Sequence, residues 1–438
     1  MGSISLAGYS QKVLVARTII QQGRVLDIVG LVIGATGPLA PVGEMCRIIS
    51  RRTKQVTLAE IVGFREDKIL LMPLGEMAGI SSGDIVESTG DSLRIKVSDS
   101  CLGRVFSGLG DPIDDLPEIL PDNSVPVYAI PPNPLKRKRI KEPLSVGVKA
   151  IDGCLTIGRG QRIGIFAGSG VGKSTLMGMI ARNTEADVNV IALIGERGRE
   201  VKEFIENSLG EEGLKRSVVV VATSDQPALI RVKGAFVATA IAEYFRDQGK
   251  NVLLMMDSIT RFSMAQREIG LTINEPPTTK GYPPSVFAMM PRLLERAGTS
   301  DVGSITGIYT VLVDSDDMNE PIADTARSIL DGHIVLDRKI AAKNIWPAID
   351  VLNSVSRVMP EVVSKEHLRA NYALRELMAT YREAEDLINI GAYVEGSNPK
   401  IDKAKKMIDS ILNYLRQSVE DKHSFEDEVN VLVNTFKG

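Results

Sequence analysis

The chain has 438 residues, of which 44% are hydrophobic and 24% are charged, so it is predicted to fold around a core and not to be disordered. At roughly 100–200 residues per domain, this length suggests two to four domains. The 52 basic and 55 acidic residues give a net charge of −3, which argues against a nucleic-acid-binding protein with a strongly basic surface.

Cysteine usage and hydropathy both favour a cytoplasmic location. The three cysteines are far apart in the chain and include no C-x-x-C pair, so neither a disulfide framework nor a zinc site is indicated. No apolar run approaches the ~20 residues needed to cross a bilayer, and the first residues do not resemble a secretion signal. We therefore expect a cytoplasmic protein.

The first folded region is predicted to be a small β-barrel at residues 24–93. Short apolar stretches are separated by Gly, Asp and Ser at the spacing typical of all-β units. These stretches cover residues 28–33, 56–62 and 69–72.

A proline-rich stretch from Pro117 to Pro134 follows the expected barrel and ends in the basic run from Lys136 to Arg139. Prolines at this density favour an extended, semi-rigid connection. For the basic run, a solvated linker is the simpler interpretation, and a nucleic-acid-binding patch is the alternative.

From about residue 160, strand-like and helix-like segments alternate. Such alternation predicts an α/β domain with a parallel sheet covered by helices on both faces, which we assign to residues 94–362. After residue 363 only helical periodicity continues, so residues 363–438 are expected to form a helical domain. The expected strands are 162–166, 188–194, 218–221 and 252–256.

A phosphate-binding loop is predicted at residues 167–174, between an expected strand and an expected helix. Its glycines allow backbone N–H groups to converge on phosphates, Lys173 would reach the β and γ oxygens, and the Ser174 hydroxyl would bind Mg²⁺. Ala167 departs from the glycine of the strict pattern. The expected nucleotide-binding residues are Gly168, Ser169, Gly170, Val171, Gly172, Lys173, Ser174 and Thr175.

Two carboxylates follow other expected strands of the same sheet. Asp257 ends an apolar strand, where it can bind Mg²⁺ through water, although a lone Asp in this position is often a turn or cap residue. Glu196 follows the strand at 188–194, and a carboxylate there can polarise the water that attacks the γ-phosphate. The alternative for Glu196 is a surface residue that caps the next helix.

Several further segments resemble the α/β-subunit superfamily of rotary ATPases, from about residue 24 almost to the C-terminus. Within that superfamily, residues 281–298 are similar to the export ATPases of type III secretion, and the flagellar branch of this family resembles the chain most. The other segments are GERGRE at 195–200, DSITRF at 257–262, PAIDVLNSVSR at 347–357, LGRVF at 102–106 and GDPID at 110–114.

The resemblance implies a RecA-like P-loop core with an N-terminal six-stranded β-barrel and a C-terminal helical domain. It also implies a homohexamer that hydrolyses ATP to ADP at its subunit boundaries to energise export of flagellar proteins. In this family pattern Glu196 activates water with Arg197 beside it, and Arg357 reaches across the boundary as an arginine finger. Trp346 stands where the family usually has a Tyr beside the adenine, on which a flat aromatic ring can stack.

The family also implies protein partners. Residues 1–23 would bind a regulator of flagellar export, and the helical domain would face the export gate and a central coiled-coil stalk. Chaperones and exported proteins would be further partners, whereas nucleic acid would not. The resemblance places such a protein peripherally on the cytoplasmic face of the inner membrane, at the flagellar base.

The sequence bears on four alternative functions. An RNA ring helicase would need aromatic residues in its barrel, but residues 23–90 contain a single one, Phe64. A catalytically silent nucleotide-binding subunit would lack the carboxylate of Glu196. The catalytic subunit of a proton-driven synthase is disfavoured by residues 281–298. An injectisome ATPase differs from the flagellar branch mainly in such stretches.

Overall fold

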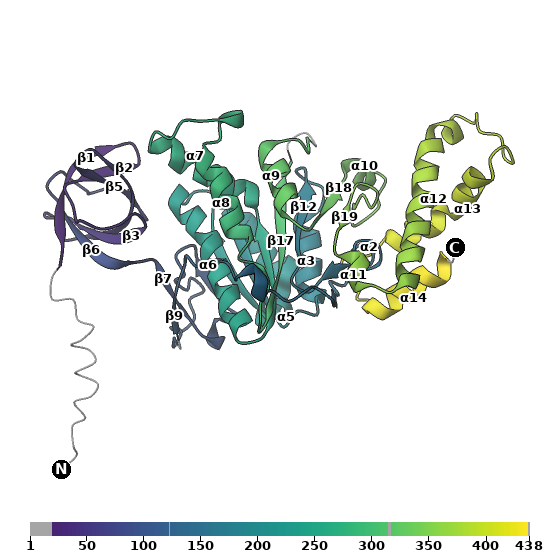
Figure 1. Cartoon of the computed structure of the whole chain (residues 1–438), viewed down its shortest axis with the longest axis horizontal. Coiled ribbons are helices and arrows are strands. Elements are labelled where there is room, and N and C mark those ends of the chain that lie inside the picture. The colour runs from purple at the N-terminus through teal and green to yellow at the C-terminus, as the bar shows by residue number, and fades with distance from the viewer. Residues whose placement is uncertain (1–19, 122, 314–316, 437–438) are drawn as a thin grey trace, which may run out of the picture. The chain divides into compact units, whose positions relative to one another are not determined.

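The polypeptide forms two units, Met1–Leu93 and Arg94–Gly438, in the computed structural model of the chain (Figure 1). The structure describes residues 20–121, 123–313 and 317–436. Most of the segment 1–23, for which we expect a partner-binding role, therefore lies outside the described residues. Each unit has a hydrophobic core of its own and is described by itself.

The six strands of the N-terminal unit pair in the order β1-β2-β5-β4-β3-β6 and close into an antiparallel barrel. Small and branched side chains such as Ala35, Ile48 and Ile61 fill its interior. The six-stranded barrel expected from the sequence is confirmed. Its strands are β1 (Gln22–Val29), β2 (Val32–Ala35), β3 (Glu44–Ile49), β4 (Val56–Arg65), β5 (Lys68–Pro73) and β6 (Ile85–Ser92).

One apolar stretch of the barrel contains a turn. Residues 28–33 are divided between two strands, because β1 ends at Val29 and pairs there with Val32, the first residue of β2. Gly30, at φ 61°, lies in the left-handed region that a two-residue hairpin turn requires. Only Gly30 interrupts the hydrophobic residues on both sides of this turn, so the stretch resembles one apolar run.

A nine-stranded sheet forms the centre of the second unit, in the order β19-β18-β12-β17-β15-β13-β14-β8, with β16 paired to β17 outside this path. All neighbours along the order are parallel except β18 and β19. The four expected strands correspond to β12, β13, β14 and β15. The strands are β8 (Val105–Ser107), β12 (Arg162–Ala167), β13 (Val188–Ile194), β14 (Ser217–Ala222), β15 (Asn251–Asp257), β16 (Gly298–Thr299), β17 (Ser304–Leu312), β18 (Gly332–Leu336) and β19 (Val355–Ser356).

Helices cover both faces of this sheet, as the alternation of strands and helices predicts. On one face α6 packs against β13, β14 and β15, and α7 against β17. On the other face Leu176 and Ile180 of α3 share a core with Ile163, Ile165 and Ile191. The helices of the core are α2 (Lys149–Cys154), α3 (Lys173–Asn183), α4 (Gly198–Glu203), α5 (Gly210–Lys215), α6 (Ala228–Asp247), α7 (Ile259–Thr272), α8 (Pro284–Leu294), α9 (Pro321–Ile329), α10 (Arg338–Ala342) and α11 (Met359–Val362).

Shorter elements complete the core. Two two-stranded sheets are formed by β7 (Arg94–Val97) with β9 (Asn123–Pro126) and by β10 (Pro143–Leu144) with β11 (Ile157–Gly158). A π-helical turn, η3 (Phe204–Leu209), joins α4 to α5. Short 3₁₀ helices are η1 (Asp99–Cys101), η2 (Pro134–Lys136) and η4 (Thr279–Gly281).

The chain ends in three helices, α12 (Lys365–Asn389), α13 (Pro399–Leu415) and α14 (Phe425–Thr435), of which α12 and α13 lie side by side (Figure 1). Buried Leu374, Ile411 and Leu432 join them to the core that contains α3 and α2. The helical C-terminal region is thus confirmed. Within the described part of the chain, no helix combines the length and the apolarity needed to cross a membrane.

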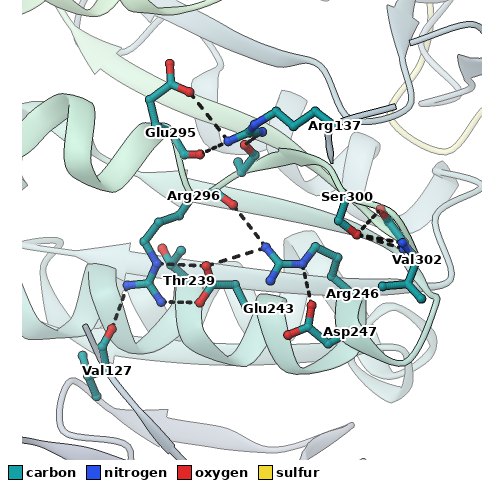
Figure 2. A network of polar contacts seen from close by, with 12 residues as sticks. Val127, Arg137, Thr239, Glu243, Arg246, Asp247, Glu295, Arg296, Ser300 and Val302 are labelled. Atoms are coloured by element: carbon teal, nitrogen blue, oxygen red, sulfur yellow. Dashed lines mark hydrogen bonds and ion pairs between the residues drawn. The ribbon is translucent and has the colours of Figure 1, made fainter. Parts of the chain in front are cut away.

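The connection from the barrel into the core is fastened to the core at two points, whereas Lys136, Lys138 and Arg139 of its basic run are exposed, as in a solvated linker. The guanidinium of Arg296, 1% exposed, pairs with both carboxylate oxygens of Glu243 and donates to the carbonyl of Val127 at 2.7 Å (Figure 2). Arg137, from the basic run, donates to the carbonyls of Ala297 (2.8 Å) and Glu295. These bonds leave one arginine of the run partly buried, which its sequence context did not reveal.

Candidate active site

The predicted phosphate-binding loop joins the end of β12 to the start of α3. Gly170 and Gly172 have φ angles of 77° and 86°, in the left-handed region that glycine adopts without strain. At Gly172 a Cβ atom would also lie 2.7 Å from the Trp346 ring. The loop therefore brings the N–H groups at the N-terminus of α3 to the edge of the sheet, which is an arrangement that binds anions.

A cavity of about 740 Å³ opens at this edge of the sheet. Most of the expected nucleotide-binding residues line it, namely Gly168, Ser169, Gly170, Gly172, Lys173, Ser174 and Thr175. The side chain of Val171 does not, because it is buried at 2% exposure in the hydrophobic core. Only the backbone of Val171 can then contribute to phosphate binding.

Three charged side chains from different elements meet where Lys173 and Glu196 line the cavity. Lys173, at the start of α3, donates a hydrogen bond from Nζ to Oδ1 of Asp257, the last residue of β15. Its Nζ also lies 3.6 Å from Oε1 of Glu196, which follows β13. Thr310 of β17 holds the same Asp257 oxygen with a 2.7 Å hydrogen bond. The carboxyl ends of the parallel strands β12 and β15, with β17 between them, thus bring together groups that are 84 residues apart in the chain.

The environment of Glu196 favours its protonated form more than water does. Burial raises the pKa of Glu196 to about 7, and the nearby negative charge of Asp257 acts in the same direction. The ammonium group of Lys173 opposes this shift. A carboxylate with a pKa near neutrality can both accept and release a proton under physiological conditions, as a general base must.

The oxygen donors of the site suit a magnesium ion. Ser174 is exposed and lines the cavity, and the carboxylate of Asp257 accepts a hydrogen bond from Lys173, the residue before Ser174. The described residues contain no group of three or more His, Cys, Asp or Glu side chains placed to hold a metal. A cation at this site would therefore take most of its oxygen ligands from nucleotide and water, as Mg²⁺ usually does.

Two arginines of the cavity lie in different environments. Arg197 is 81% exposed and pairs with Glu200 at 3.2 Å, so it lines the cavity without contacting Glu196. Arg261, in the first turn of α7, packs so closely on Gly195 that a Cβ there would lie 2.8 Å from its own Cβ. Its Nε is buried and has no hydrogen-bond partner among the described residues. Arg261 was not among the expected site residues, although the DSITRF stretch contains it.

Trp346 lies beside the phosphate-binding loop, where its ring faces Gly172. Its indole Nε1 donates to Oδ1 of Asn344 at 3.1 Å, and the side chain remains 40% exposed. A partly exposed aromatic face next to a phosphate-binding loop is suited to stacking on a nucleobase.

Arg357 lies at the opposite edge of the sheet. Ser356, the residue before it, pairs with Gly332 at the start of β18, whereas Ala167 of the loop pairs with Leu336 at the end of that strand. This register separates Arg357 from its own phosphate-binding loop by about 16 Å along the sheet. The exposed guanidinium donates to the carbonyl of Leu330 at 3.4 Å. The structure therefore does not bring Arg357 into the cavity of its own chain.

Models of known families match most of the chain, apart from residues 91–146 between the first two matches. The β-barrel domain of the ATP synthase alpha/beta family matches residues 25–90, and the nucleotide-binding domain of that family matches residues 147–356. The T3SS EscN ATPase C-terminal domain matches residues 363–434.

Individual proteins agree with these models. The "Flagellum-specific ATP synthase" of Bacillus subtilis is 58% identical over 415 residues, which are 94% of each chain. The assembled ATPase EscN of the enteropathogenic Escherichia coli type III secretion system is 50% identical, with a TM-score of 0.90 over 94% of this chain and all of that one. EscN in complex with its central stalk EscO matches with a TM-score of 0.88, 49% identity and the same coverage.

These comparisons confirm the family, the fold class and the ATPase activity predicted from the sequence. The chain belongs to the ATP synthase alpha/beta family and, within it, to the group formed by the flagellum-specific ATP synthases and the type III secretion ATPases.

Proposed function

We propose that the chain is the ATPase of a flagellar type III protein export apparatus and that it hydrolyses ATP to energise the export of flagellar proteins. The cluster of Lys173, Glu196 and Asp257 at the phosphate-binding loop carries the proposal of hydrolysis. The flagellar assignment is supported by the 58% identity to a flagellum-specific relative, against 52% to a type III secretion ATPase over the same 94% of the chain. An injectisome ATPase is the second candidate, because both relatives cover the chain equally.

The site residues divide the work of hydrolysis. Backbone N–H groups of residues 168–175 and the ammonium of Lys173 hold the phosphates of ATP. Mg²⁺ held by Ser174 and Asp257 would neutralise negative charge on the phosphate oxygens. Glu196 accepts a proton from the water that attacks the γ-phosphorus, the bond from that phosphorus to the bridging oxygen breaks, and ADP and phosphate leave.

Arg197 and Trp346 complete the nucleotide contacts. Arg197 is exposed at the rim of the cavity, where its charge can assist as the γ-phosphate is transferred. Trp346 stacks on the adenine, with its ring already held against Gly172.

The active site is proposed to be completed between subunits of a homohexamer. Arg357 lies on the edge of the sheet away from its own cavity and is exposed, so it is suited to reach the nucleotide bound by a neighbouring copy. An arginine supplied in this way stabilises the charge of the transition state. A solved relative described as an assembled ATPase supports assembly.

Partners and location follow from the same family. We propose that residues 1–23 bind the export regulator and that residues 363–438 face the export gate, chaperones, exported proteins and a central coiled-coil stalk. The relative EscN forms a complex with its central stalk EscO, which supports the last of these contacts. The protein would act at the cytoplasmic face of the inner membrane. Its domains would be a barrel at 24–93, an ATPase domain at 94–362 and this helical domain.

Two measurements test this function. The ATPase rate per subunit should rise steeply and cooperatively with protein concentration, and a rate independent of concentration in a monomeric protein would contradict a site shared between subunits. Expression in a flagellated strain that lacks its own export ATPase should restore motility. Restoration of injectisome secretion, but not of motility, would favour the second candidate.

A further inference from the structure

A buried glutamine at the amino end of β12 contacts the segment that presents Arg357. Gln161 is fully buried, and its Oε1 accepts a hydrogen bond from the backbone N–H of Gly158 at 2.9 Å. Its Nε2 lies 3.1 Å from the hydroxyl of Ser356 and donates to the carbonyl of Asp331 at 3.3 Å. Gln161 therefore joins β12 to the residue before Arg357 and to the turn before β18.

The next residue, Arg162, holds the same turn. Its backbone N–H donates to Oδ2 of Asp331 at 3.0 Å, and its guanidinium contacts both oxygens of that carboxylate at 3.2 and 3.3 Å. In return, the N–H of Asp331 donates to the carbonyl of Arg162 at 2.8 Å. Arg162 Nη1 also forms a 2.5 Å ion pair with Glu295, the carboxylate that faces Arg137 in Figure 2.

Arg357 is held by the backbone that these two residues fix. Its N–H donates to the carbonyl of Asp331 at 3.0 Å, and its Nη1 donates to the carbonyl of Leu330 at 3.4 Å. The hydroxyl of Ser356 donates in addition to the carbonyl of Thr156 at 2.8 Å. The exposed arginine thus extends from a segment that several hydrogen bonds hold to β12 and to the turn before β18.

The opposite end of β12 carries the phosphate-binding loop. The strand is paired in parallel with β17 on one side and β18 on the other, and most of its side chains are buried. A strand packed in this way moves as a unit, because close-packed interiors transmit displacement and do not absorb it. A shift of the loop on nucleotide binding or release would then reach Gln161 and Arg162.

We propose that Gln161 and Arg162 are positioning residues for Arg357, so that β12 couples the phosphate-binding loop of one subunit to the arginine which that subunit lends to the next. This inference rests on the proposed role of Arg357 between subunits. It adds a route by which occupancy of one nucleotide site changes the catalytic power of its neighbour.

The test mixes subunits with complementary defects. Gln161→Leu keeps its own Lys173 and Glu196 but is expected to present a misplaced arginine, whereas Glu196→Gln presents an intact arginine and has an inactive site. Gln161→Leu alone should lose roughly 10–100-fold in kcat with little change in nucleotide affinity, because small misplacements of a catalytic group cost this much. Mixed one to one with Glu196→Gln, it should recover toward roughly a quarter of the wild-type rate, since half of the subunits keep a live site and half of those receive an intact arginine.

Two controls accompany the mixture. Arg357→Ala mixed with Glu196→Gln is the reference pair and should recover in the same way. Gln266→Leu removes another buried glutamine, whose Nε2 donates to Ser285 at 3.2 Å, and should leave kcat near the wild-type value. Ser356→Ala removes the hydroxyl that Gln161 contacts and provides a milder variant if Gln161→Leu does not fold.

The outcomes separate the two proposals. If the reference pair recovers activity but neither Gln161→Leu nor Ser356→Ala does, the positioning role is wrong and the shared site stands. If the reference pair itself fails to recover, the shared site is wrong and the positioning role falls with it. Recovery by the reference pair and by either positioning variant supports both.

Discussion

The two edges of the central sheet carry similar polar side chains in opposite settings. At the carboxyl edge, Lys173 and Glu196 line a cavity, and the acids Glu196 and Asp257 both contact the one ammonium group of Lys173. At the amino edge, Gln161 and Arg162 are bonded to protein backbone and to a partner carboxylate. The charged groups at the carboxyl edge are therefore available to a ligand, whereas those at the amino edge hold segments of the chain together.

The largest expected effect is the loss of the base at the carboxyl edge. Glu196→Gln should lower turnover by roughly 10²–10⁴, the usual contribution of a positioned general base, and retain ATP binding. A steady-state assay measures the fall in turnover, and calorimetry measures whether ATP affinity is retained. Glu203→Gln, an exposed change on α4, is the matched control. Near-normal hydrolysis by Glu196→Gln would mean that Glu196 is not the general base.

Loss of the ammonium group comes next. Lys173→Ala should weaken ATP binding about 100-fold, because hydrogen bonds to charged groups contribute about 1.5–3 kcal/mol. Lys202→Ala, at an exposed lysine of α4, should bind ATP like the wild type. Unchanged affinity of Lys173→Ala by calorimetry would mean that the loop does not bind the phosphates.

The carboxyl edge should also impose a pH dependence. Burial and the charge of Asp257 raise the pKa of Glu196 to about 7, and the base works only when ionised. We therefore expect kcat/KM to fall about tenfold per pH unit below pH 7 and to level off above it, since this ratio reports ionisation in the free enzyme. The control is the nucleotide affinity of Glu196→Gln over the same pH range, which should not show this fall. A flat profile between pH 5.5 and 8 would contradict this assignment.

At the amino edge, a substitution should lower the free energy of unfolding. Arg162→Met would leave the carboxylates of Asp331 and Glu295 without their shared partner, at a cost of roughly 1–3 kcal/mol in the free energy of unfolding. Denaturant unfolding measures it, and Glu196→Gln should show no comparable loss. Equal stability losses at the two edges would remove the contrast between them.

The smallest expected effect concerns the adenine. Trp346→Ala should raise KM for ATP about fivefold with little change in kcat, because an aromatic stacking contact contributes about 0.5–1.5 kcal/mol. Trp346→Phe keeps a flat ring, so its KM for ATP should lie between those of the wild type and Trp346→Ala. A fall in kcat with KM unchanged would instead place Trp346 in the hydrolysis step.

Sequence patterns were informative where one short segment contains both a residue and its setting. Asp257 could be placed at a strand end because the apolar run before it is continuous, and Lys173 because the loop motif is local. Strand β17 was missed because Gly307 and two threonines interrupt its apolar character. Arg261 was missed because its approach to Gly195 depends on how α7 packs against the end of β13.

No local sequence pattern could predict the surroundings of Arg357. Gln161 and Ser356 are 195 residues apart, and Arg162 and Asp331 are 169 apart. Their contact depends on the order of strands in the sheet, which a single sequence does not reveal. For the same reason the partial burial of Arg137 could not be expected from a basic run among prolines.

The position of Trp346 makes the protein its own spectroscopic reporter. It is the only tryptophan in the chain, and it combines partial exposure with contact to the phosphate-binding loop. Any change in tryptophan emission on addition of ATP or ADP can therefore come only from the surroundings of this one ring. Nucleotide arrival and departure at each subunit should be measurable in the unlabelled protein by stopped-flow fluorescence, including in mixed assemblies where some subunits carry Trp346→Phe.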